Sequence, residues 1–150
     1  MYAGDLDGAI EAWRKTFEIA PDFGVSHGYL ADLYAVQRRY AEAEAEYDKG
    51  SPRDRVERGR GVMYALAGRR AYALRVVEQM AERATRGYVS PAARGLIWVA
   101  LGEKDRGYAL LRQACAQSDW MLLEVKMDPL LESLRAEPRF HDLLKCIHLE

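Results

Sequence analysis

Two clusters in the sequence carry side chains of the kind that bind metal ions. Near the N-terminus, Asp5 and Asp7 lie between Gly4 and Gly8, and calcium-binding loops also combine carboxylates with glycine. Such a loop requires a third ligand and a Glu at its twelfth position, where this sequence has Thr16. We therefore interpret the segment as a turn whose acidic residues begin a helix, because the helix dipole favours negative charge there.

Near the C-terminus, His141, Cys146 and His148 carry groups that bind zinc. A closed zinc site needs four ligands, and no fourth Cys or His lies nearby. We interpret the three as ordinary residues of a helical tail and predict no metal and no cofactor. The other cysteine, Cys115, ends an amphipathic stretch, and packing is its expected role. Two cysteines are too few for a disulfide framework and favour a reducing, cytoplasmic environment.

The sequence lacks the common catalytic motifs. It contains no G-x-x-x-x-G-K-[ST] phosphate loop, no G-x-S-x-G nucleophile turn and no H-E-x-x-H metal motif. No base and orienting group accompany any of the candidate residues His27, Cys115, His141, Cys146 and His148. The sequence therefore predicts a protein that is not an enzyme.

The composition is that of one globular domain. The 150 residues are 49% apolar and 30% charged, which is an ordinary balance for a folded protein. With 22 Lys and Arg against 23 Asp and Glu, the net charge of −1 favours neither nucleic acid nor a membrane surface as a partner. The longest apolar run, residues 96–101, is far shorter than the ~20 residues that span a membrane.

The elements that position these side chains follow from an internal repeat. Similar residues recur 34 positions apart: Ala9 and Ala43, Trp13 and Tyr47, Tyr64 and Trp98, Gly68 and Gly102. The interval falls to 30 between Ala43 and Ala73, and between Tyr34 and Tyr64. Because two independent pairs share this offset, we interpret it as a shortened loop with the register kept.

Apolar residues within each unit recur at helical spacing, and breakers such as Pro21, Gly50 and the Ser90–Pro91 helix start separate them. The pattern predicts helices over 5–20, 24–37, 41–50, 54–67, 70–86, 90–101 and 104–118. Small residues recur with the same period, and we expect them to let neighbouring helix backbones approach closely. No stretch alternates for long enough to predict a strand.

The repeat resembles the tetratricopeptide repeat, whose 34-residue helix–turn–helix unit carries aromatic and small residues at fixed positions. The matching residues are Ala9, Trp13 and Pro21, then Leu30, Tyr34, Ala43 and Tyr47, then Gly61, Tyr64, Gly68 and Ala73, then Gly95, Trp98, Gly102, Leu111 and Ala114. His27 departs from the family pattern, which prefers Trp there. The resemblance implies an all-α, right-handed superhelix of helix–turn–helix repeats over residues 1–119, with the first repeat lacking its first helix.

The rhythm stops at Asp119, and we expect residues 120–150 to form capping helices of the same domain. Helix candidates here are the apolar run 120–125 and the segments that begin at Asp128–Pro129 and Glu137–Pro138. The stretches 101–111 and 127–144 also resemble the C-terminal repeat regions of bacterial winged-helix regulators, class III nucleotide cyclases and serine/threonine kinases. That resemblance implies an alternative function, as a regulatory or oligomerisation tail of a multidomain signalling protein.

The leading prediction is a non-enzymatic scaffold that binds a peptide or protein partner in the concave groove of the repeats. The middle of the chain, residues 51–100, contains ten Arg and four Asp or Glu, and most of these arginines are interpreted as solvated. Arg55 and Arg58 begin an inner helix and are expected to hold an acidic partner. The expected groove residues are Val25, Tyr29, Asp32, Arg55, Arg58, Val62, Leu96 and Val99.

The helix predicted at 5–20 lacks one neighbour, because the first repeat lacks its first helix. Its apolar stripe consists of Leu6, Ile10, Trp13 and Phe17. Leaving such a stripe in water is unfavourable by ~1.5–3 kcal/mol for each large side chain. Either a second copy of the chain covers the stripe, or the sequence is a fragment of a protein that extends upstream. We favour a homodimer in which two N-terminal helices meet about a two-fold axis.

Overall fold

The computed structural model describes residues 5–148, so Gly4 of the acidic turn and the outermost residues of the predicted repeat and capping regions lie outside the described residues. The described part of the chain is all helical and contains no strand. Its elements, in order, are α1 (Leu6–Ile19), α2 (Gly24–Val36), α3 (Tyr40–Lys49), α4 (Arg53–Leu66), α5 (Arg70–Ala84), α6 (Pro91–Ala100), α7 (Lys104–Ala116), η1 (Trp120–Glu124), η2 (Pro129–Leu134) and α8 (Pro138–Cys146), where η marks a 3₁₀ helix.

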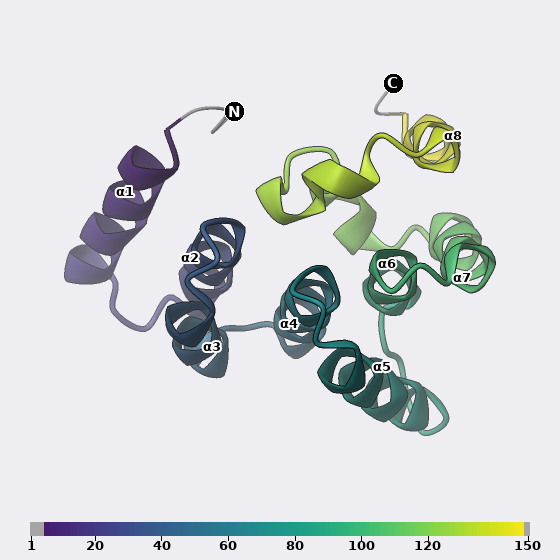
Figure 1. Ribbon diagram of the computed structural model, residues 1–150, viewed down its shortest axis with the longest axis horizontal. Helices are drawn as coiled ribbons and strands as arrows, with labels where there is room; N and C mark the ends of the chain where they lie inside the picture. Colours follow the sequence, from purple (N-terminus) through teal and green to yellow (C-terminus); the bar gives the residue numbers. More distant parts are fainter. Residues whose placement is uncertain (1–4, 149–150) are drawn as a thin grey trace.

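The helices from α2 to α7 form three antiparallel pairs that follow one another along an arc (Figure 1). Helices α2, α4 and α6 line the inside of the arc, and α3, α5 and α7 cover the outside. Helix α1 packs on α2 in the place of the second helix of an earlier repeat. All-α helix–turn–helix repeats, as predicted, are therefore the architecture of the chain.

Each repeat contains the same turn between its two helices. The backbone of Arg38, Gly68 and Gly102 has a φ of 60°, 77° and 87° respectively, in the left-handed region that ends many helices. In each turn a backbone N–H donates to the aromatic residue five positions before it, as from Arg39 to the carbonyl of Tyr34 at 2.9 Å. The two helices of each repeat are therefore joined by the same backbone geometry.

The four residues missing between the second and third units are not lost from a loop alone. Helix α3 has 10 residues, whereas α1 has 14 and α5 has 15. The shortening thus falls largely within a helix, followed by the tight connection 50–52. The register is kept, because Tyr47 near the end of α3 is buried like the other core residues.

Small residues allow the closest helix contact, between α6 and α7. A Cβ atom at Gly107 would lie 2.7 Å from the carbonyl oxygen of Gly95 and 2.8 Å from the backbone nitrogen of Val99. A Cβ at Gly95 would lie 2.8 Å from the carbonyl oxygen of Gly107. The expectation that the repeated small residues bring helix backbones together is confirmed here.

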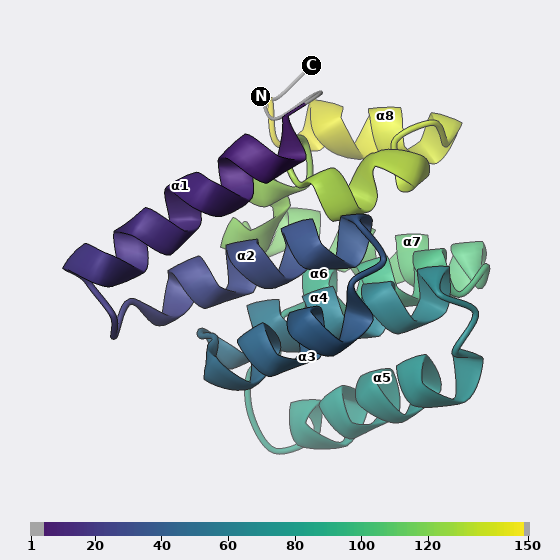
Figure 2. The same cartoon turned by 60° about the vertical axis from the view of Figure 1, so that its left-hand side comes forward.

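The C-terminal segment, residues 119–136, folds back into the arc (Figures 1 and 2). Two of the expected helices are short 3₁₀ helices; η1 packs on α6, and η2 packs on α2 and α4. Asp128 begins η2 as predicted, since its carboxylate accepts from the N–H of Leu130 at 2.9 Å. The apolar side chains of Leu122, Val125 and Leu131 are fully buried. The concave face is therefore largely filled by the chain itself.

Candidate functional site

The inner helices direct charged side chains at the C-terminal segment. Arg55 of α4 donates to Asp32 of α2 at 2.8 Å, and its Nε lies 3.1 Å from a carboxylate oxygen of Glu124. Arg58, one turn further along α4, donates to Asp128. It also lies 3.7 Å from Asp32 and 3.5 Å from Glu124. Two guanidinium groups thus join three carboxylates, two of which belong to the C-terminal segment.

Aromatic residues complete this buried charge network. The hydroxyl of Tyr47 donates to Asp32 at 2.6 Å, and that of Tyr29 donates to Glu124 at 2.9 Å. The guanidinium of Arg55 lies over the ring of Tyr29, 4.2 Å from its centre, in a cation–π arrangement. Each charged group of the network thus makes at least one hydrogen bond. The Nε atoms of both arginines and Oε2 of Glu124 have no hydrogen-bond partner among the described residues, and Nε of Arg55 and Oε2 of Glu124 are held by ion pairing alone.

Two glycines make room for the network. A Cβ at Gly28 would lie 2.7 Å from a nitrogen of Arg55, and a Cβ at Gly59 would lie 2.7 Å from Asp32 and from the ring of Tyr47. The inner helices carry no side chain at these two positions. The guanidinium and the phenol occupy that space.

The network shifts the titration of its carboxyl groups in opposite directions. Burial and the negative charge of Asp128 raise the pKa of Asp32 to about 6, although Arg55 and Arg58 act against this. Burial would also raise the pKa of Asp128, but Arg58 and Arg55 outweigh it, and the pKa is lowered. Asp128 is therefore the firmly ionised partner of the arginine pair, whereas Asp32 gains a proton under mildly acidic conditions.

The structure corrects the expected exposure of the groove arginines. Arg55 and Arg58 are only 1% and 0% exposed, because the carboxylates of the chain's own C-terminal segment bind them. The reason for expecting an acidic partner at these two side chains therefore falls away.

The other expected groove residues divide between the core and the cleft. Asp32, Val62, Leu96 and Val99 are buried as well. Val25 and Tyr29 are half-buried, and Tyr29 is the one that borders open space.

An apolar cleft of about 420 Å³ remains at the N-terminal end of the concave face. Its lining residues are Trp13, Tyr29, Leu123, Glu124, Met127, Asp128 and Pro129. Trp13 and Tyr29 stack with ring centres 5.2 Å apart, whereas Leu123 and Met127 are 60% and 56% exposed. The sequence prediction did not single out Leu123 and Met127. Their signal is the density of apolar residues over 120–127, more than one face of a short helix can bury.

We expected the apolar stripe of the N-terminal helix to be exposed to water, but the chain itself covers much of it. Ile10 is 4% exposed, and Leu6, Trp13 and Phe17 are half-buried against the core. Helix α2 covers the stripe, and the ring of Phe17 stacks on His27 with 4.2 Å between centres. The missing first helix therefore leaves less uncovered surface than the repeat pattern alone suggests. Self-association through these residues stays a prediction.

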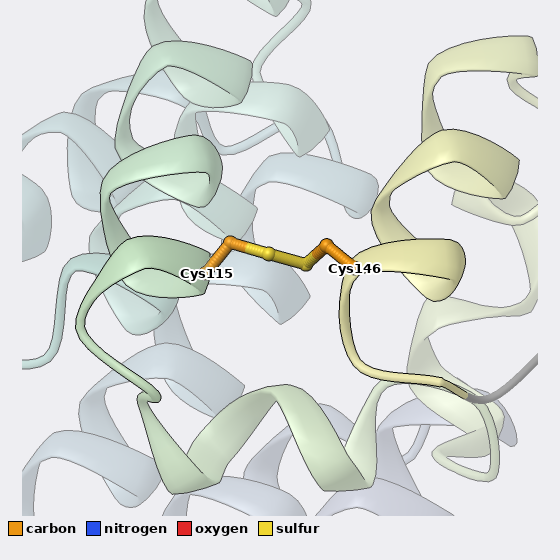
Figure 3. Close-up of a disulfide and its surroundings, with 2 residues drawn as sticks. All are labelled: Cys115 and Cys146. Carbon is orange, nitrogen blue, oxygen red and sulfur yellow. A yellow bond between two sulfur atoms is a disulfide. The ribbon is translucent and has the colours of Figure 1, made fainter.

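The two cysteines form a disulfide between α7 and α8, which corrects the expectation that Cys115 serves packing alone and that Cys146 is an ordinary tail residue (Figure 3). Their Cα atoms lie 6.3 Å apart, within the usual range for a disulfide. Periodicity could not reveal this pairing, because Cys146 lies beyond the repeats.

Within residues 5–148, no group of three or more His, Cys, Asp or Glu side chains is arranged to hold a metal ion. None of the helices described for this chain is long and apolar enough to cross a membrane.

Antiparallel helix pairs in an arc, with a recurrent turn and paired small residues, define a helical-repeat protein of the α-solenoid class. Residues 1–63 match the family model described as tetratricopeptide repeat. This match over the first part of the chain, together with the all-helical architecture, supports a tetratricopeptide-repeat type of protein. No curated protein and no solved structure matches the chain.

Proposed function

We propose that this protein is a non-enzymatic binding module that holds an apolar segment of a partner protein in the cleft between α1, α2 and the C-terminal segment. Tetratricopeptide repeats generally mediate protein–protein interaction, which supports the class of function. The arginines of the concave face bind the chain's own carboxylates, so the partner contacts the part of that face which remains open.

The observation that carries the proposal is the apolar character of this cleft. Leu123 and Met127 expose more than half of their surface beside the stacked rings of Trp13 and Tyr29. Aromatic residues and Met are enriched in the cores of protein interfaces, and burying each such side chain contributes ~1.5–3 kcal/mol. A concave, largely preformed site keeps the ordering cost of binding low.

Selection from a displayed library of random peptides against the intact chain tests the proposal. Selected peptides should bind the wild-type protein, and the double variant Leu123→Asp/Met127→Asp should bind them at least about tenfold more weakly, because a charge would be desolvated in the cleft. The control is Tyr72→Asp, which changes a half-exposed residue of the outer helix α5. Equal binding by wild type and double variant would refute the proposal.

The alternative proposal is a regulatory or oligomerisation tail of a multidomain bacterial signalling protein. It is supported by the resemblance of residues 101–111 and 127–144 to such tails. An output domain encoded in frame upstream of this segment would favour this alternative over the binding module.

A further inference from the structure

We propose that Cys115 and Cys146 are a reversible redox clip that sets the mobility of one wall of the cleft. The disulfide joins the last turn of α7 to the last residue of α8. The covalent loop that it closes contains the entire C-terminal segment, including Leu123 and Met127. The effect on partner binding rests on the proposed function, whereas the effect on the segment itself does not.

Few contacts besides the disulfide hold α8 on α7, so breaking the disulfide should affect the position of α8. At the N-terminal end of α8, Glu137 forms an ion pair with Lys104 of α7. Arg139 forms a second ion pair with Asp105, and both of these side chains are well exposed. Phe140 is the main buried anchor, with Leu143 beside it. Exposed ion pairs contribute little, so the C-terminal end of α8 depends on the disulfide and on the packing of Leu143, Leu144 and Ile147 against the core.

The disulfide is within reach of small molecules. Cys146 is exposed and Cys115 is half-buried, and both line an open cleft of about 260 Å³ on the surface between α7 and α8. Arg112 and Arg139 border the same cleft together with Asp142. The thiolate is the form of a cysteine that attacks a disulfide.

The exchange needs only a low-molecular-weight disulfide, such as oxidised glutathione. One cysteine thiolate attacks it, forms a mixed disulfide and releases one glutathione thiolate. The second cysteine then attacks the mixed disulfide, closes the Cys115–Cys146 bond and releases a second glutathione. The protein loses two electrons and two protons, and one glutathione disulfide becomes two thiols. Reduced glutathione reverses both steps.

Reduction should loosen the segment without unfolding the repeats. The disulfide restricts the states in which α8 leaves α7, and opening the bond removes that restriction. The buried core of α2, α4 and α6 does not contain either cysteine. We expect α8 to open first and the loop carrying Leu123 and Met127 to become more mobile with it.

Hydrogen exchange on the intact chain tests this proposal. The protein is equilibrated with oxidised or reduced glutathione, and thiol titration and intact mass report the bond. In the reduced form, amide exchange of residues 138–146 should be at least about tenfold faster, with exchange in α4 unchanged. The variant Cys146→Ser, carried through both treatments, should exchange like the reduced protein in each and so exclude an effect of the reagents.

The outcomes separate this proposal from the proposed function. Failure to form an intramolecular disulfide, or equal exchange of α8 in both forms, would overturn the redox clip. A peptide selected for the cleft should bind the oxidised form more tightly than the reduced form, and equal affinity would overturn the link between clip and cleft. If no peptide can be selected in either form, the proposed function fails, while the exchange result still decides the clip.

Discussion

Arg58 and Asp128 lie 70 positions apart in the sequence, and the guanidinium of Arg58 donates to the Asp128 carboxylate in the interior of the protein. This pair joins the inner face of the repeats to the C-terminal segment. Both side chains are almost fully buried, so each has exchanged its hydration for the other. The contact therefore makes the C-terminal segment part of the fold.

Removing one member of this pair should be strongly destabilising. In Arg58→Ala the carboxylate of Asp128 stays buried with less compensation, and the free energy of unfolding should fall by ~3–5 kcal/mol. Urea unfolding followed by circular dichroism measures the change. The matched control is Arg53→Ala in the same helix, because Arg53 is 69% exposed and pairs with Glu57 within one turn. That control should cost less than ~1 kcal/mol, and an equal loss in both variants would contradict the prediction.

A glycine at position 38 should stabilise the protein. Arg38 has a φ of 60° in the turn where the two later repeats have Gly68 and Gly102. Its side chain is exposed, so relief of the left-handed backbone outweighs the loss of side-chain contacts. Arg38→Gly should raise the free energy of unfolding by ~1 kcal/mol in thermal or urea unfolding. Gly68→Ala, the reverse change at the equivalent position, should lower it by a similar amount.

The close approach of α6 and α7 should not tolerate a methyl group. In Gly107→Ala the added Cβ meets two backbone atoms at less than 3 Å, so the helices must move apart. We expect a loss of ~1–3 kcal/mol in the free energy of unfolding. Gly87→Ala is the control, because a Cβ at Gly87 would meet nothing within 4 Å. A stable Gly107→Ala variant would show that the two helices are less tightly packed than the structure indicates.

Two isoleucines of α1 test which face of this helix the fold buries. Ile10 is 4% exposed and Ile19 is 87% exposed. Ile10→Ala should lower the free energy of unfolding by ~2–5 kcal/mol, whereas Ile19→Ala should change it by less than ~0.5 kcal/mol. If the chain forms a dimer through the stripe of Leu6, Ile10, Trp13 and Phe17, Phe17→Glu should shift sedimentation towards monomer while the later repeats stay folded. Stability losses of equal size in the two alanine variants would contradict the burial of Ile10.

Much of the fold was predictable, because the repeat is a local pattern. The spacing of Tyr64 and Trp98 and the breaker Ser90–Pro91 place the predicted helices within a few residues of the observed ones. Ser90 caps α6 as expected, since its hydroxyl accepts from the N–H of Ala93 at 3.0 Å. Helix spacing and helix caps depend on residues within one or two turns of each other, so the sequence alone is enough to predict them.

The candidate site was less predictable, because it depends on contacts between distant segments. The start of α4 gave Arg55 and Arg58 as carboxylate-binding residues, but no periodicity indicates that Glu124 and Asp128 supply the carboxylates. The same limit applies to Cys115 and Cys146, whose helices meet only after the C-terminal segment has folded back. The sequence therefore indicated that the two arginines bind carboxylates, but it did not indicate which residues supply those carboxylates.

Because of the buried carboxyl of Asp32, the free energy of unfolding should depend on pH, and Asp32→Asn should remove this dependence. Because its pKa is raised to about 6 in the folded protein, the folded state binds this proton more tightly than the unfolded state does. The contribution of Asp32 to stability is therefore complete below its ordinary pKa of about 4 and is lost as the pH rises through about 6. Asp128 acts in the opposite sense at lower pH, because its pKa is lowered.

Urea unfolding at about pH 7 and about pH 5 isolates the group, since Asp128 stays ionised at both. The wild-type protein should gain stability from Asp32 at the lower pH, and Asp32→Asn should lack this gain because an amide does not titrate. Asp48→Asn is the control, because Asp48 forms its ion pair with Arg60 while 74% exposed. It should keep the wild-type difference between the two pH values. A wild-type difference that survives unchanged in Asp32→Asn would assign the proton to another group of the buried network.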